Sequence, residues 1–175
     1  TRKESSAASD VYKRQGLLVW MLVSGAADGL RRSKASAAME GRTALGLSQP
    51  AVGIPAGQSL RAVEQTAAQL EPGTSVVGME DGIPVGVLDG GRLSAVPSHE
   101  RAASPLSRAL LPIRPSAILP EELSGHDLLE AAVRCASPVM VVVDAEGTVT
   151  GTLSAARLNA ELERSGLIRP DGSAR

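Results

Sequence analysis

One short segment of the sequence contains residues of the kind that bind zinc and act as general bases. His99 is followed directly by Glu100, as in the His-Glu-x-x-His pattern, where two histidines one helical turn apart bind zinc and the glutamate acts as a base. The residue three positions after Glu100 is Ala103, so the second histidine is absent. His126 lies far away in the sequence, and no Cys/His cluster has metal-ligand spacing. The sequence therefore predicts no metal site in this chain.

Two other segments place a polar residue and an arginine three positions apart, directly after an apolar run. The polar residue lies where a helix N-cap is expected, since its side-chain oxygen can accept a hydrogen bond from the first turn. The guanidinium of the arginine suits a phosphate or the carboxylate of an acidic partner. The alternative is that both arginines are solvated on helix surfaces. These residues are Asp89 and Arg92 in one segment and Ser154 and Arg157 in the other.

The composition limits the functions that these residues can serve. Of the 175 residues, 43% are hydrophobic and 21% are charged, so the chain can bury a core, although it has no Phe. The formal net charge of −1 argues against a general nucleic-acid-binding surface. The single cysteine, Cys135, rules out a disulfide framework within the chain and fits a reducing compartment.

The beginning of the chain is expected to stand outside the fold. Residues 1–15 show no apolar periodicity, and Asp10-Val11-Tyr12-Lys13-Arg14-Gln15 resembles the in-frame translation of an adapter used in preparing sequencing libraries. A natural basic tail is the alternative. Under the first interpretation, the natural protein extends further upstream than this sequence.

An uncharged run of apolar and small residues follows at 16–27 and is interpreted as the end of a membrane helix. It is shorter than the ~20 residues that span a bilayer, so we expect the first half of that helix upstream. The basic residues after it are typical of the cytoplasmic side of a membrane. We therefore expect a truncated transmembrane helix over 16–30, a juxtamembrane linker over 31–49, and a cytoplasmic location beyond. A buried helix or a signal-peptide core is the alternative. The basic residues are Arg31, Arg32, Lys34 and Arg42.

An internal repeat covers most of the remaining chain. Two segments align without a gap at a constant offset of 65 residues, and their identities fall on glycines and apolar positions, where a shared backbone requires them. The sequence therefore predicts one structural unit used twice. The aligned pairs include Pro55 with Pro120, Ser59 with Ser124, Gly82 with Gly147, Gly86 with Gly151, and Arg92 with Arg157.

Each copy shows the same order of predicted elements, namely helix, strand, hairpin, strand and helix. The first helix follows a serine that can cap it, and the hairpin turn contains a glycine, which adopts the positive φ of tight turns. Short apolar runs predict strands buried on both faces. The predicted elements are caps at Ser59 and Ser124, strands at 75–79 and 139–143, turns at Asp81-Gly82 and Glu146-Gly147, return strands at 83–88 and 148–153, and closing helices from near Asp89 and Ser154.

Two such units in tandem resemble a CBS pair, the small sensor module named after cystathionine β-synthase domains; the resemblance covers about residues 50–164. The order of parts is similar to the C-terminal region of bacterial site-2 proteases. In these intramembrane zinc metalloproteases, a last membrane helix ends in a basic stretch, here Gly29-Leu30-Arg31-Arg32-Ser33, and a degenerate CBS pair follows. The resemblance implies an α/β fold: a tandem CBS-pair-like module after a truncated transmembrane helix.

The resemblance also indicates where zinc would be bound in such a protease. The family uses His-Glu-x-x-His and an aspartate in a Leu-Asp-Gly-Gly segment. Leu88-Asp89-Gly90-Gly91 spells that segment, but the repeat aligns Asp89 with Ser154 at a strand-to-helix step, so we interpret Asp89 as a helix cap. We expect no catalytic residue and no metal ligand in this chain, with zinc in an upstream domain.

Adenosine nucleotides are ligands that CBS pairs often hold between their repeats. The second strand of such a pair ends in Gly-x-x-Ser/Thr-x-x-Asp, with the hydroxyl facing phosphate and the carboxylate gripping ribose. Here Ser154 keeps the hydroxyl position in the second copy, Asp89 replaces the hydroxyl in the first, and Arg92 and Arg157 occupy the acidic positions. The resemblance thus implies that Asp89, Arg92, Ser154 and Arg157 are the candidate binding residues of the cleft. The expectation of nucleotide binding is therefore weak.

These inferences combine into one expected function: a non-catalytic cytosolic regulatory module of a membrane-embedded site-2-type protease. A nucleotide-sensing CBS pair of a channel, transporter or free-standing protein is the alternative, and a soluble domain without a membrane parent is a third. The expected partners are the membrane, the upstream protease domain and a second copy of the chain, but not nucleic acid. The expected segments are 1–15, the membrane helix 16–30, the linker 31–49, the first repeat 50–99, the connector 100–114, the second repeat 115–164 and the tail 165–175.

Overall fold

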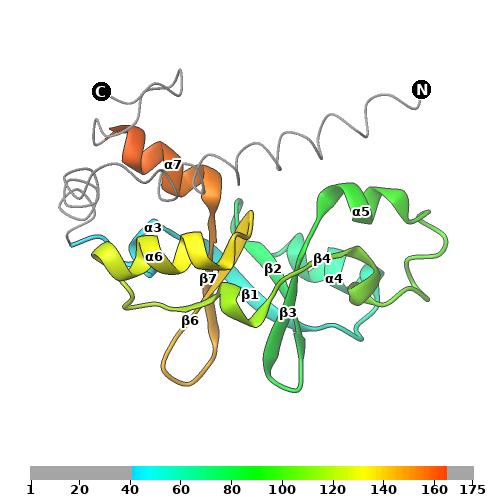
Figure 1. The fold of residues 1–175 in the computed structure, drawn as a ribbon. Coiled ribbons are helices and arrows are strands. Elements are labelled where there is room, and N and C mark those ends of the chain that lie inside the picture. Colours follow the sequence, from blue (N-terminus) through cyan, green and yellow to red (C-terminus); the bar gives the residue numbers. More distant parts are fainter. Residues whose placement is uncertain (1–40, 165–175) are drawn as a thin grey trace.

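The computed structural model describes residues 41–164, which form two similar α/β units (Figure 1). The expectations for the adapter-like segment, the membrane helix, most of the linker and the tail fall on residues outside this range. Within 41–164, no helix has both the length and the apolar character needed to cross a membrane.

The two units repeat the same elements at the offset found in the sequence. In each unit a helix leads into an antiparallel pair of strands, and a second helix follows. The repeat prediction is therefore confirmed at the level of secondary structure. The first unit contains α4 (Leu60–Ala67), β2 (Ser75–Glu80), β3 (Ile83–Leu88) and α5 (Gly90–Ala95), and the second contains α6 (Gly125–Cys135), β6 (Val139–Val143), β7 (Val149–Ser154) and α7 (Ala155–Arg164).

The hairpin turns use the residues that the sequence indicated. Asp81 and Gly82 both have positive φ, at 50° and 78°, and Gly147 has a φ of 82°. In the second hairpin, the Asp144 carboxylate also accepts hydrogen bonds from the backbone N–H groups of Glu146 and Thr148, at 3.1 and 2.7 Å. A short polar side chain thus closes the turn around the glycine.

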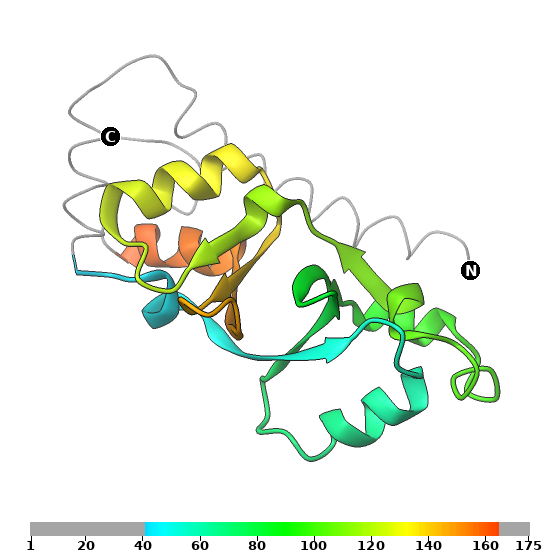
Figure 2. The same ribbon diagram turned by 90° about the horizontal axis from the view of Figure 1, so that it is seen from below.

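A strand that the repeat analysis did not predict joins the two units. Strand β1 (Gln49–Pro55) pairs antiparallel with β7 through its first two residues and parallel with β2 through the rest. The sheet order is β4-β3-β2-β1-β7-β6-β5, with β4 (Leu110–Pro112) and β5 (Ile118–Pro120) at the edges. Figure 2 shows β1 in cyan passing from one unit to the other, with the segment that carries β4 and β5 crossing on the other side.

Residues 43–49 differ from the expected linker. They form the short helix α3 (Ala44–Leu47) and the start of β1, and they pack on the second repeat. The connector 100–114 likewise contains the 3₁₀ turn η1 (Leu106–Ala109) and β4, which pack on the first repeat; a second such turn, η2 (Pro115–Ala117), precedes β5. The repeat analysis missed residues 43–49 and the segment with η1 and β4, because each lies outside the predicted bounds of the repeat that it completes.

The two segments dock on the two units in the same way. Ala44 N–H donates to the carbonyl of Leu123 at 2.7 Å, and Gly125 N–H donates to the carbonyl of Arg42 at 3.3 Å. In the first unit, the N–H of Leu106 donates to Gln58 at 2.7 Å, and the N–H of Leu60 donates to Ser104 at 2.8 Å. The structure therefore has an approximate twofold relation that includes the docked segments.

The expected side-chain cap of helix α6 is wrong, whereas that of α4 is confirmed. Ser59 caps α4 as predicted, because its Oγ accepts from the N–H of Ala62 at 3.3 Å. Ser124 precedes α6 but makes no side-chain capping bond. The first backbone N–H of each helix donates to a docked segment, Gly125 to Arg42 and Leu60 to Ser104, so the two helix starts differ in the serine bond alone.

Three groups of apolar side chains hold the molecule together. One lies in each repeat and includes residues of the docked segment, namely Ala44 and Leu47 in the second repeat and Leu106 and Leu110 in the first. The third lies between the repeats and consists of small branched side chains, as expected for a chain without Phe. Its buried members are Val77, Val87, Val141 and Val149.

Candidate functional site

The first candidate pair, Asp89 and Arg92, lies where β3 ends and α5 begins. The Oδ1 atom of Asp89 accepts a hydrogen bond from the backbone N–H of Arg92 at 2.8 Å, and the N–H of Asp89 donates to the carbonyl of Ala109 at 3.0 Å. Asp89 is therefore the N-cap of α5, as the repeat alignment predicted. Its half-buried carboxylate stabilises the free end of a helix of only six residues.

The second pair, Ser154 and Arg157, occupies the equivalent step in the second repeat. The Oγ atom of Ser154 accepts from the backbone N–H of Arg157 at 3.2 Å. A hydroxyl and a carboxylate thus perform the same capping task in the two repeats. The structure joins the members of each pair but divides the pairs between α5 and α7, which lie apart in Figure 1.

The side chains of Arg92 and Arg157 are exposed on their helices. Each follows its cap by three residues, so the guanidinium projects from the first turn, where the free N–H groups of the helix also lie. This placement fits the interpretation of solvated arginines and leaves both side chains within reach of an acidic group in solvent.

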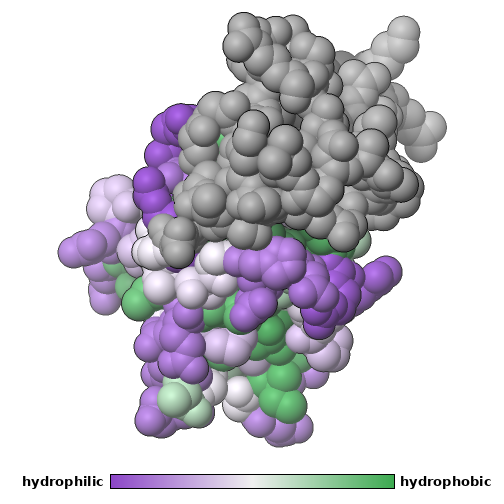
Figure 3. Space-filling model, turned by 60° about the vertical axis from the view of Figure 1, so that its left-hand side comes forward, coloured by the Kyte–Doolittle hydropathy of each residue, from purple (hydrophilic) through white to green (hydrophobic). Residues whose placement is uncertain are grey.

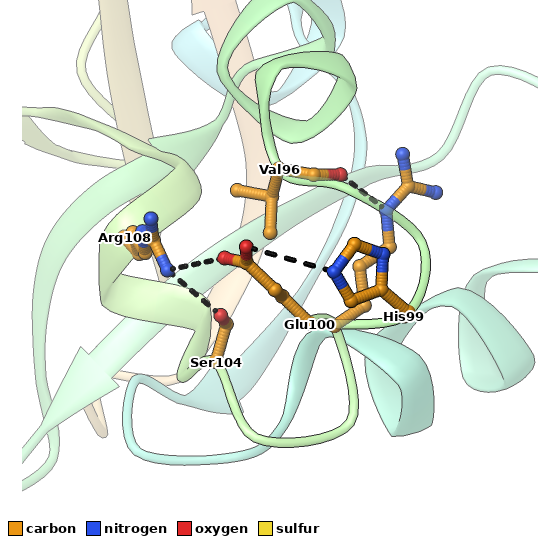
Figure 4. A network of polar contacts seen from close by, with 6 residues as sticks. Val96, His99, Glu100, Ser104 and Arg108 are labelled. Atoms are coloured by element: carbon orange, nitrogen blue, oxygen red, sulfur yellow. Dashed lines mark hydrogen bonds and ion pairs between the residues drawn. The ribbon is translucent and has the colours of Figure 1, made fainter.

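The His99-Glu100 segment belongs to a surface network of polar contacts (Figure 4). The Glu100 carboxylate lies 3.9 Å from His99 Nε2 and accepts a hydrogen bond from Arg108 Nη1 at 3.4 Å. The same Nη1 donates to Ser104 Oγ at 3.1 Å. These contacts connect the loop after α5 with η1. Because the network contains one histidine, we interpret it as a structural contact and not as a zinc site.

Arg101 is a structural residue that the sequence analysis did not single out. Its Nε donates to the carbonyl of Val96 at 3.0 Å, its Nη2 donates to Leu93 at 3.3 Å, and its Nη1 pairs with Glu64 of α4. The side chain is 22% exposed. One guanidinium thereby ties the end of α5 to α4. Its ion-pair partner Glu64 lies 37 residues away in the chain, so no local pattern in the sequence indicates this contact.

The sequence analysis also did not predict a polar contact between the two repeats. The Oγ1 of Thr152 donates to the Oγ of Ser75 at 3.0 Å, and Thr152 is 5% exposed. The two residues flank β1 where it passes from the second repeat to the first. The repeat offset aligns Thr152 with the apolar Val87, and this replacement of an apolar residue by a polar one was the available signal.

The residues present do not fit a zinc ion. Within residues 41–164, His, Cys, Asp and Glu side chains form no group of three that could hold a metal. The Asp89 carboxylate accepts a hydrogen bond from the helix backbone. The free thiol of Cys135 is buried, and desolvation by burial raises the pKa of this thiol. A thiol that stays protonated is a poor ligand and a poor nucleophile.

The surface gives little further indication of a ligand. On the face toward the second repeat, hydrophilic residues surround a narrower hydrophobic band (Figure 3). Among the described residues, Leu45 and Ile83 are the large apolar side chains that are exposed, at 44% and 58%. Single exposed apolar side chains such as these two are normal on protein surfaces.

No protein-family model matches the sequence, and no curated protein does. Solved structures do match the fold. The CBS domain of the bacterial CNNM/CorC family Mg²⁺ transporter, in complex with an inhibitor, has a TM-score of 0.52 at 18% identity, over 83% of this chain and 92% of that one. The same domain in complex with ATP has a TM-score of 0.52 at 17% identity, over 76% and 95% of the two chains.

A third solved structure, the cytosolic domain of the Mg²⁺ channel MgtE in complex with ATP, has a TM-score of 0.50 at 19% identity. The match covers 72% of this chain and 51% of that one. At these identities the likeness concerns the fold. Together with the doubled helix-strand-strand-helix unit and the sheet shared through β1, it shows that residues 41–164 have the mixed α/β fold of a tandem CBS pair.

Proposed function

We propose that this chain is the non-catalytic regulatory module of a membrane-embedded site-2-type zinc metalloprotease, and that it lies on the cytosolic side of the membrane. The observation that carries the regulatory part of the proposal is the docking of residues 42–48 in the second repeat. Any domain upstream of the module is thereby connected to its core. A change in the module can reach that domain through this segment.

The path of the chain supports such coupling. The docked segment leads directly into β1, which pairs with β7 in the second repeat and with β2 in the first. A rotation of one repeat against the other therefore alters the pairing of β1 and the position of the segment before it. Small shifts between packed units are a common means by which regulatory domains act on their neighbours.

The choice of a protease as the parent is supported by the sequence order. The uncharged run at 16–27, the basic residues that follow it and the degenerate CBS pair succeed one another as in site-2 proteases. Zinc and its ligands belong to the upstream domain in this proposal, and no residue between 41 and 164 is assigned a catalytic step.

A nucleotide-sensing CBS pair of a transporter or channel is the second candidate. The solved structures with ATP, from a CNNM/CorC transporter and from MgtE, favour it. The exposed arginines at positions 92 and 157 weigh against it, because the ribose-binding pattern has a carboxylate at each of these positions.

The upstream reading frame distinguishes the two candidates. We expect sequencing upstream of Thr1 in the source DNA to find further apolar spans and a His-Glu-x-x-His helix. Apolar spans without that motif would favour the transporter candidate, and a frame without apolar spans would overturn both membrane assignments.

Nucleotide binding is tested separately with the chain itself. Calorimetric titration with ATP and with AMP is expected to show no saturable binding up to millimolar nucleotide. Saturable binding would support the second candidate, especially if R92D or R157D, which introduce the missing carboxylate, tightened it. R134D provides the matched control, because Arg134 is also an exposed arginine, on another helix, α6.

A further inference from the structure

The segment Arg42–Ser48, which we name the strap, completes the second repeat from far upstream in the chain. It supplies two buried apolar residues to the core of that repeat, Ala44 at 0% and Leu47 at 4% exposure. It also forms hydrogen bonds with the loop before α6, where Ala44 N–H donates to Leu123 and Leu45 N–H donates to Glu121. The second repeat is therefore incomplete without the strap.

The strap is held differently from its counterpart in the first repeat. The counterpart, Ser104–Leu110, follows α5 after a short loop, so the chain itself keeps it close to its repeat. The whole first repeat separates the strap from the repeat on which it docks. The stretch of chain between the strap and its docking site is longer than that between Ser104–Leu110 and its docking site, so docking of the strap costs more entropy. The noncovalent contacts of the strap must offset this cost.

An ion pair ties the strap to the closing helix of its repeat, at a position that is apolar in the first repeat. The carboxylate of Glu161 on α7 is 3% exposed, and its Oε1 lies 2.7 Å from Nη2 of Arg42 on the strap. Its Oε2 lies 2.5 Å from Nη1 of Arg164 on the same helix. The repeat offset aligns Glu161 with Val96, which is also buried, at 4% exposure. A buried position that is apolar in one repeat therefore carries a carboxylate in the other.

The placement of a carboxylate there has a physical consequence. A buried charge is tolerated when cationic partners compensate its lost hydration, and removing a partner is costly. Arg42 is 52% exposed and Arg164 is 65% exposed, so each arginine reaches from the surface to the carboxylate. Arg164 belongs to the same helix and stays near Glu161 when the strap leaves, whereas Arg42 leaves with it.

We propose that the Arg42–Glu161 ion pair is a latch that holds the strap on the second repeat, and that the strap opens as a unit when this pair is broken, while the first repeat stays folded. The strap is then a conformational device. Its regulatory consequence rests on the proposed function, because an opened strap disconnects an upstream domain from β7 and α7. The latch itself can be tested on this chain without any knowledge of the parent protein.

Hydrogen exchange at single amides, read by NMR on the full chain, tests the latch. In R42M we expect the exchange of the Ala44 and Leu45 amides to accelerate roughly tenfold, as expected for the loss of a partly buried charge pair. Amides of β2 in the first repeat should keep their wild-type rates. E161Q, which removes the charge but keeps the shape, should accelerate the same strap amides.

The control is R134M on α6, which removes an exposed ion pair with Glu130, 2.8 Å long and distant from the strap in sequence. It should leave strap exchange unchanged. The proposal is overturned if R42M leaves the strap amides at wild-type rates, or if strap and β2 amides accelerate equally, since opening would then be global. If E161Q does not fold, R42M alone still tests the latch, because the side chain of Arg42 is half exposed. None of these outcomes depends on the upstream reading frame, which tests the protease assignment.

Discussion

A Cβ atom on Gly151 would lie 2.9 Å from the backbone carbonyl oxygen of Gln49, because β7 runs closely beside the start of β1. The aligned glycine of the first repeat, Gly86, has the same relation to the carbonyl oxygen of Leu111 in β4, at 2.8 Å. At both glycines, the backbone that follows a docked segment leaves no room for a side chain. Gly86 and Gly151 therefore align in the repeat because a neighbouring backbone passes close to each of them. Gly82 and Gly147 align because both lie in hairpin turns with positive φ.

Replacing Gly151 with alanine should loosen the docked segment. The added methyl overlaps the backbone of Gln49 and the Cβ of Ser48, which cannot both move without breaking the pairing of β1 with β7. We expect G151A to lower the free energy of unfolding by about 1–3 kcal/mol, the usual cost of overpacking. Urea denaturation measures it. G90A is the control, since a Cβ there meets nothing within 4 Å and alanine favours the helix; equal losses in both variants would refute the crossing argument.

Replacing Asp89 with alanine should cost about 1 kcal/mol of stability, because the first turn of α5 loses its cap. Asp89→Ser should recover most of the loss, since serine caps the equivalent helix at position 154. Thermal and urea unfolding of both variants provide the measurement. An alanine variant as stable as the wild type would show that the capping bond contributes nothing and would reopen a ligand-binding role for this carboxylate.

Replacing Arg101 with methionine should destabilise the first repeat. The change keeps the apolar stem but leaves the carbonyls of Leu93 and Val96 and the carboxylate of Glu64 without the guanidinium. We expect a loss of about 1–3 kcal/mol, as for charged hydrogen bonds at a partly buried site. The matched control R134M removes an exposed pair and should change stability by less than about 0.5 kcal/mol. Equal effects of the two variants would contradict the assigned role of Arg101.

Stability should fall at alkaline pH because of Cys135. Burial raises the pKa of this thiol in the folded state, so the unfolded chain releases the proton first as the pH rises. The contribution is fully present below the unfolded thiol pKa of ~8.5 and is lost above it, at up to about 1.4 kcal/mol per pH unit. Urea denaturation between pH 7 and 10 should show a steeper decline for the wild type than for C135A. Parallel curves would contradict the prediction.

The sequence by itself determined the repeated unit. Hairpin glycines, apolar runs and capping residues are local signals, because each depends on the preferred φ, the alternation or the hydrogen bonding of a few neighbouring residues. They located β2, β3, β6 and β7 to within a residue, together with the caps at Asp89 and Ser154. The expectation of no zinc centre at His99-Glu100 rests on a different local feature, Ala103 in place of the second histidine.

Only the tertiary structure decided which segments complete each unit. The strap and η1 contribute to their cores through residues separated from their partners by long stretches of chain, and such contacts leave no periodic pattern. The hydrogen bond from the first N–H of α6 to the carbonyl of Arg42, the burial of Glu161 and the ion pair of Arg101 with Glu64 are of the same kind. They arise when the folded chain brings distant backbone and charges together, because burial then requires each polar group to find a partner.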